Sequence, residues 1–316
     1  MQAYIARRLL SALIGTIGLS ILIFLLLRVA PGDAAVMLLG EDVSAKPERL
    51  QELRAQLGLD KSIPLQYADW LRDLARGDLG TSLFSGRAIT NELANRLPIS
   101  LELTLIAMGL SLLISLPIGI FAAMYPESLA DQGLRFLSVI GLAVPNFWMG
   151  TMVMVFGARL FNWIPPVGYS SIWSDPGRNL EQFIIPSLIV ATAVAASQVR
   201  LMRSTMLEVL GNDYIRTARA KGLRERAVVS RHALKNAMIP VLTLFASQFG
   251  RIITGIVIIE NIFNLPGLGR FILESISKRD YPMVQGIILL IGVWVVLLNL
   301  LTDLMYGWFD PRIRYK

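Results

Sequence analysis

The sequence of 316 residues contains no cysteine and one histidine, His232. Without cysteine, disulfide bonds, iron–sulfur clusters, thiolate zinc sites and a cysteine nucleophile are all excluded. A single histidine also excludes a multi-histidine metal site. Charged residues are scarce, because they make up 17% of the chain against 54% for hydrophobic residues. A soluble protein of this length carries about 25% charged residues, so the composition predicts a protein embedded in a bilayer.

Long uncharged stretches are present instead. A helix that crosses a bilayer core of about 30 Å needs about 20 mostly apolar residues. Five uncharged stretches meet this requirement, and a sixth of sufficient length carries Arg251 and Glu260. We therefore predict an all-α integral membrane protein with six transmembrane helices. The expected segments are residues 1–30 with the N-terminus and the first span, then 99–125, 134–162, 182–200, 237–262 and 283–308.

The positions of the basic residues predict the orientation of these spans. Lysine and arginine gather before the first span, in the loop 201–236 and in the C-terminal residues 310–316. Six spans place all three regions on one side of the membrane, and short cytoplasmic loops carry the excess of positive charge. Both termini are therefore expected in the cytoplasm. This topology accounts for the net charge of +7 without a nucleic-acid partner.

The segment 31–98 then lies outside the cell membrane, on the periplasmic side. Pro47 and Pro64 each open a stretch in which leucines recur at helical spacing, so two short helices are expected there. These helices fit a docking platform for an extracytoplasmic partner, and they fit equally a cap on the outer ends of the spans.

A short helix is also expected in the cytoplasmic loop. Asn212 or Asp213 can cap its start by accepting backbone N–H bonds, good helix formers follow through Lys221, and Gly222 supplies a left-handed stop. A helix of about two turns is unstable alone in water, so packing must hold it in place.

The side chains of this short helix suit contact with another surface. Ala218 and Ala220 permit close approach, and three neighbours add positive charge: Arg216, Arg219 and Lys221. A second helix is expected from residue 223 to about 236, leading into span five. This arrangement can transmit a movement of a soluble partner to a membrane-spanning helix.

Motifs along the whole chain resemble one family. TARAKGL followed by HALKNAMIP resembles the coupling motif of ABC importer permeases, in the variant typical of the dipeptide, oligopeptide and nickel permeases. Further matching stretches are RLPISLELTL, IENIFNLPGLGRFI, RDYPMVQG and the ending DPRIRY. In other importer families the coupling motif begins with Glu-Ala-Ala, whereas this chain has Arg216, Thr217 and Ala218. The resemblance implies the type I permease fold and one half of a translocation pathway that works by alternating access.

The resemblance also implies a coupling helix seated in a groove of an ATPase subunit. Its residues are Tyr214, Arg216, Thr217, Ala218, Arg219, Ala220, Lys221, Gly222 and Leu223. The sequence lacks the phosphate-binding pattern G-x-x-x-x-G-K-[ST], so ATP and Mg are expected on partner ATPases. We expect no catalytic residue, cofactor or metal on this chain.

The implied partners complete a binding-protein-dependent importer in a bacterial inner membrane. They are a second homologous permease that forms a heterodimer with this chain, two ATPase subunits or domains, and a periplasmic or extracellular substrate-binding protein. The expected cargo is a dipeptide or oligopeptide, with glutathione-like peptides and nickel chelates as alternatives. A self-sufficient channel or secondary transporter is disfavoured because no internal repeat is evident.

Polar residues inside the spans indicate the pathway. Span five places Ser247, Arg251 and Thr254 on one helix face, and Gln248 lies beside them. Asn299 in span six is a further candidate. A central arginine costs about 2.5–3.5 kcal/mol to insert, so Arg251 is expected to face a cavity or a counter-charge. It fits a site for a substrate carboxylate, and it fits equally a structural ion pair with Glu260, Asp303 or the partner permease.

Overall fold

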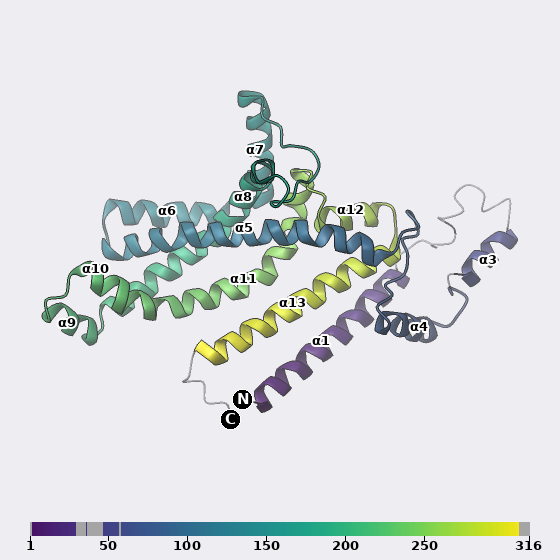
Figure 1. Cartoon of the computed structure of the whole chain (residues 1–316), viewed down its shortest axis with the longest axis horizontal. Helices are drawn as coiled ribbons and strands as arrows, with labels where there is room; N and C mark the ends of the chain where they lie inside the picture. The colour runs from purple at the N-terminus through teal and green to yellow at the C-terminus, as the bar shows by residue number, and fades with distance from the viewer. Residues whose placement is uncertain (1, 30–35, 37–46, 57, 310–316) are drawn as a thin grey trace. The chain divides into compact units, whose positions relative to one another are not determined.

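A computed structural model describes residues 2–29, 36, 47–56 and 58–309 of the chain. Helices dominate this part of the chain, and the one β-bridge within it joins Thr81 to Ala88. The helices shown in Figure 1 are α1 (Gln2–Val29), α3 (Pro47–Gln56), α4 (Ile63–Ala75), α5 (Ile89–Met124), α6 (Leu129–Ala143), α7 (Asn146–Phe161), α8 (Pro176–Leu210), α9 (Asp213–Ala220), α10 (Glu225–Ala227), the π-helix η2 (Val228–Ala233), α11 (Leu234–Ile262), α12 (Leu268–Ser277) and α13 (Tyr281–Phe309). The predicted all-α class is confirmed.

Within the described residues, four helices are long and apolar enough to cross a membrane. They contain the stretches Ala6–Val29, Ile89–Met124, Pro176–Leu210 and Tyr281–Leu300. Two bent helix pairs pass the same test together, namely α6 with α7, and Glu225–Ile253 with Gly255–Ile262. Counting each bent pair as one span gives six, so the number and the membrane boundaries of the predicted spans stay predictions.

The third expected span, residues 134–162, consists of two helices that meet at 94°. Val144 at the end of α6 is extended, with φ −80° and ψ 120°, and Pro145 precedes α7. Proline has no N–H for helical hydrogen bonding, and it pushes the preceding residue out of the helical region. Pro145 therefore accounts for the break between the two helices, which divides the expected span.

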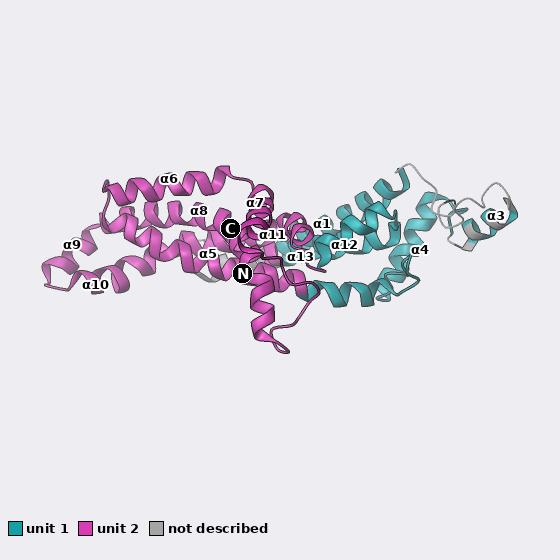
Figure 2. Cartoon of the chain, turned by 90° about the horizontal axis from the view of Figure 1, so that it is seen from above, with its two compact units in different colours: residues 1–98, 267–297 teal, residues 99–266, 298–316 magenta. Residues whose placement is uncertain are grey.

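The chain forms two compact units (Figure 2). The first comprises residues 1–98 and 267–297. Its core is a cluster around Ile89, Leu93, Leu268, Met283 and Ile287, which joins the start of α5 to α12 and α13. The two short helices predicted after Pro47 and around Pro64 are present as α3 and α4. Residues 31–35 and 37–46 of the expected outer segment lie outside the described residues, as do residues 310–316.

Aromatic side chains hold α4 against α1 in this unit. The ring centroids of Phe24 and Tyr67 lie 5.2 Å apart, and those of Phe24 and Trp70 lie 5.9 Å apart. The hydroxyl groups of Ser20 and Tyr67 share a hydrogen bond of 2.8 Å. These contacts combine apolar burial with a satisfied polar tip, so they fix the position of α4 on α1.

The second unit comprises residues 99–266 and 298–316, and its core lies between α5, α8 and α11. Gly119 permits a close approach of α5 to α8, because a Cβ atom there would lie 2.6 Å from the Cβ of Met202 on α8. The α6 helix is tied to α8 by an ion pair. The carboxylate of Asp131 accepts hydrogen bonds of 2.6 and 2.7 Å from the Arg203 guanidinium.

Candidate coupling surface and translocation path

The coupling segment begins with α9, which starts and stops near the predicted residues. Gly222 follows it with φ +77°, a left-handed conformation that favours glycine. The backbone carbonyl of Asn212 accepts hydrogen bonds from the N–H groups of Ile215 and Arg216, but its side chain makes no capping bond. The predicted side-chain cap is therefore wrong. Asp213 instead places negative charge in the first turn, where it interacts favourably with the positive end of the helix dipole.

This helix has one buried face and one exposed face. Ile215 is 0% exposed and Ala218 is 6% exposed, and both belong to a cluster with Val228 and Val229 of η2 and Met206 of α8. The small Ala218 side chain therefore faces the protein's own core. The other predicted coupling residues are exposed: Tyr214, Arg216, Thr217, Arg219, Ala220, Lys221, Gly222 and Leu223. Three positively charged side chains thus stand on the exposed face, and two of them, Arg216 and Arg219, pair with acidic residues.

Two polar contacts connect α9 to the segment that follows it. Asn236 on α11 donates a hydrogen bond of 2.8 Å to the hydroxyl oxygen of Tyr214. Arg219 forms hydrogen bonds of 2.7 and 3.1 Å with the carboxylate of Glu225. These bonds raise the pKa of Arg219 above its ordinary value. Both side chains of this ion pair are about half exposed, so it contributes little to stability.

The connection from α9 to α11 contains a π-helix. The predicted helix over 223–236 is divided into α10, η2 and the start of α11. Val228, Val229 and Ala233 of η2 are buried, and they pack against α8 and α9. A π-helix accommodates about one extra residue in a turn. Such helices are rare and often occur at functional sites. Figure 2 shows α9 and α10 together at one end of their unit.

The predicted pathway residues divide between an exposed face and a buried contact. Ser247 and Arg251 are exposed, one turn apart on α11. Gln248 is 7% exposed and donates a hydrogen bond of 2.8 Å to the Ser197 hydroxyl on α8. The structure therefore places Gln248 against α8 and away from that exposed face. Asn299 is exposed on α13.

Two further predictions fall beyond what the structure describes. The side chain of Thr254 lies outside the described residues, as does that of Asp303. Whether Arg251 meets a substrate carboxylate or Asp303 stays a prediction.

Sequence reasoning missed a set of buried polar contacts between α5, α8 and α11. Ser115 donates a hydrogen bond of 2.8 Å to Gln198, and Ser100 donates one of 2.5 Å to Glu260. Gln198 and Glu260 are 0% exposed. Polar residues inside otherwise apolar stretches were the available signal, but spacing alone does not show which helix they face. These contacts stabilise the helix packing behind the exposed face of α11.

Comparison with known proteins identifies the fold and the family of this chain. The crystal structure of an amino acid ABC transporter with histidines superposes with a TM-score of 0.54 at 15% identity, covering 69% of this chain and 94% of that one. The fold is therefore that of an ABC transporter permease. Residues 115–315 match the family described as binding-protein-dependent transport system inner membrane component, and residues 1–104 match the N-terminal part of such membrane components. The chain belongs to this family.

Full-length relatives carry more specific names. The dipeptide transport system permease protein DppB of Escherichia coli K12 is 38% identical over 339 residues. The oligopeptide transport system permease protein AppB of Bacillus subtilis is 39% identical over 319 residues. A putative peptide transport system permease protein of Brucella abortus is 38% identical over 315 residues. Each alignment covers 100% of both chains.

Proposed function

We propose that this chain is the permease subunit of an ATP-driven, binding-protein-dependent importer of dipeptides and oligopeptides. The observation that carries the proposal is the full-length identity of 38–39% to relatives named as dipeptide and oligopeptide permeases. The chain supplies half of the pathway, and a second homologous permease supplies the other half. Two ATPase subunits bind ATP and Mg, and a substrate-binding protein delivers the peptide from outside.

The exposed face of α9 is the proposed contact with an ATPase. Arg216, Arg219 and Lys221 offer positive charge to a groove, while Ile215 and Ala218 hold the helix to η2 and the end of α8. A displacement of α9 therefore moves a packed cluster that continues into α11 through Ala237 and Val241. Because packed clusters rearrange as units, this route can convert ATPase closure into alternating access.

The proposed orientation places both termini and the α9–η2 segment in the cytoplasm. The supporting observation is the excess of lysine and arginine in these regions. A cysteine introduced at Thr217 should react with a membrane-impermeant maleimide only in inside-out vesicles, since the natural chain has no competing cysteine. Labelling of the same residue in intact cells would contradict the orientation.

Purification and transport together test the function. The tagged chain, isolated gently from its native membrane, should carry a second permease and one or two ATPases, identified by mass spectrometry. Proteoliposomes with this complex and its binding protein should take up a dipeptide only with ATP. Combined Arg216→Ala and Lys221→Ala replacement should abolish uptake, while Arg87→Ala in the other unit should not. A chain that purifies alone and moves solute without ATP would refute the proposal.

A further inference from the structure

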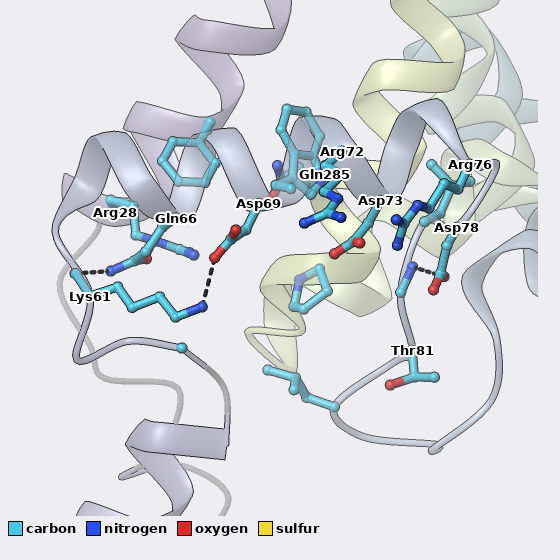
Figure 3. Close-up of a pocket in the computed structure, with 17 residues that line it drawn as sticks. Arg28, Lys61, Gln66, Asp69, Arg72, Asp73, Arg76, Asp78, Thr81 and Gln285 are labelled. Atoms are coloured by element: carbon cyan, nitrogen blue, oxygen red, sulfur yellow. Dashed lines mark hydrogen bonds and ion pairs between the residues drawn. The ribbon is translucent and has the colours of Figure 1, made fainter.

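A cavity of about 510 Å³ lies in the unit of residues 1–98 and 267–297 (Figure 3). Its walls come from α4, the end of α1, the loop after α4 and the start of α13. Small-molecule sites usually have volumes of about 300–1,000 Å³, so this cavity has the size of a binding site. It shares no lining residue with α9 or with the exposed face of α11.

Some of the charges that line the cavity are already satisfied within the protein. Lys61 and Asp69 form an ion pair of 2.6 Å at one end. Arg28 donates a hydrogen bond of 2.8 Å from Nε to Gln66, and Asp78 accepts one of 2.8 Å from the N–H of Gly80. These contacts shape the two ends of the cavity.

Other polar groups on the wall are open to solvent or lack a partner within the protein. Arg72, Asp73 and Arg76 are exposed to solvent, and within the described part of the chain their side chains form no close hydrogen bond or ion pair, although Asp73 attracts Lys61 electrostatically. Gln285 of α13 is 6% exposed, and its Nε2 group donates to no acceptor there. Buried amide donors in folded proteins are normally hydrogen-bonded, so this donor can be paired by a water or by a molecule bound in the cavity. Figure 3 shows Arg72, Asp73 and Gln285 between the Lys61–Asp69 ion pair and Asp78.

The charges of both signs and the unpaired Gln285 amide together favour a ligand that carries both charges. Arg72 on α4 and Arg76 at the C-cap of this helix lie four residues apart and form a positive row, and Asp73 places a carboxylate beside it. A guanidinium and an amide N–H suit a carboxylate, because each donates hydrogen bonds to its oxygens. An aspartate suits an ammonium group. A simple anion would be attracted by the arginines but repelled by Asp73.

We propose that this cavity binds a short zwitterionic peptide, with its C-terminal carboxylate at Arg72 and Gln285 and its amino group at Asp73. The identity of the ligand rests on the proposed function, because peptides are the cargo named there. The site is a holding place on the permease itself, separate from the path along α11. In the proposed orientation it opens on the side where the binding protein delivers the cargo.

Direct binding tests this site on the intact importer without its binding protein or nucleotide. The complex in lipid nanodiscs would be titrated calorimetrically with dialanine and with N-acetyl-dialanine amide, which lacks both charges. Dialanine should bind and the blocked peptide should not. Gln285→Leu and Arg72→Gln should each weaken dialanine binding at least tenfold, and Arg87→Gln, outside the cavity, should leave it unchanged. Gln285→Glu keeps the shape but turns a donor into a negative charge, so it should abolish binding in a protein that still assembles.

Each outcome decides the proposal. Absence of dialanine binding, equal binding of the blocked peptide, or unchanged binding in Gln285→Glu would overturn it. ATP-driven uptake with the binding protein is measured on the same preparations. Intact uptake without direct binding would refute the cavity site and leave the importer function standing, whereas loss of uptake in the natural protein would refute the function itself.

Discussion

Replacement of Asp131 by asparagine should destabilise the protein strongly. Asp131 is 0% exposed, and its carboxylate accepts two hydrogen bonds of 2.6 and 2.7 Å from Arg203. The N–H of Glu127 donates a third bond of 3.0 Å, and Arg135 lies 3.7 Å away. Asparagine keeps the shape of the side chain but removes the charge that all of these groups face.

The expected loss of unfolding free energy follows from how exposed Asp131 and Arg203 are. Removing one member of a buried ion pair costs about 3–5 kcal/mol, because the other charge is left uncompensated. Arg203 keeps 19% of its side-chain surface exposed, so water recovers part of this energy. We expect Asp131→Asn to lower the free energy of unfolding by about 2–3 kcal/mol. That loss corresponds to a factor of about 30–150 in the unfolding equilibrium constant.

The assay is reversible unfolding of the purified chain in mixed micelles, followed by circular dichroism as the denaturing detergent increases. Asp213→Asn is the matched control, because Asp213 is 93% exposed and pairs with Arg216 at 3.2 Å. Exposed pairs contribute about 0–1 kcal/mol, so this control should change stability little. A loss below about 0.5 kcal/mol for Asp131→Asn would refute the reasoning. So would additivity with Arg203→Gln, since contacting residues should be coupled.

Three further substitutions test other parts of the structure. Gly119→Ala should lower the thermal midpoint of the complex, because the new Cβ would lie 2.6 Å from the Cβ of Met202 on α8. Gly109→Ala is the control: a Cβ there meets nothing within 4 Å, so it should raise the midpoint slightly. Equal midpoints would contradict the close packing of α5 on α8. Gly222→Ala strains a left-handed residue by about 1–2 kcal/mol and should reduce peptide-stimulated ATP hydrolysis, whereas Gly211→Ala, at φ −79°, should not. Arg251→Ala should reduce peptide uptake without loss of assembly if the guanidinium meets the substrate; normal uptake by a less stable complex would assign it a structural role.

Local signals in the sequence predicted much of the helical framework. Pro145 marked the break between α6 and α7 because proline restricts the backbone, and Gly222 marked the stop after α9 because glycine readily adopts a left-handed conformation. The coupling residues followed from a contiguous motif. In contrast, the Asp131–Arg203 pair joins residues 72 positions apart, and no periodicity identifies such partners.

The cavity and the buried polar contacts were beyond prediction for the same reason. The cavity takes Arg28 from α1, Arg72 from α4 and Gln285 from α13, and only the packing of unit 1–98 and 267–297 assembles them. Spacing placed Gln248 beside Arg251, but the structure turns it toward Ser197. A helical pattern fixes angles around one axis, whereas the neighbour on each side depends on tertiary structure.

The π-helix between α10 and α11 changes how residues must be assigned to faces. Each residue of an α-helix advances about 100° around the axis, and the wider π-turn takes up about one residue more per turn. A helical wheel drawn continuously from Glu225 to Ile262 would therefore rotate every position after Ala233 onto the wrong side. Cysteine-scanning of this segment, which the cysteine-free chain permits, must count its register afresh from Leu234.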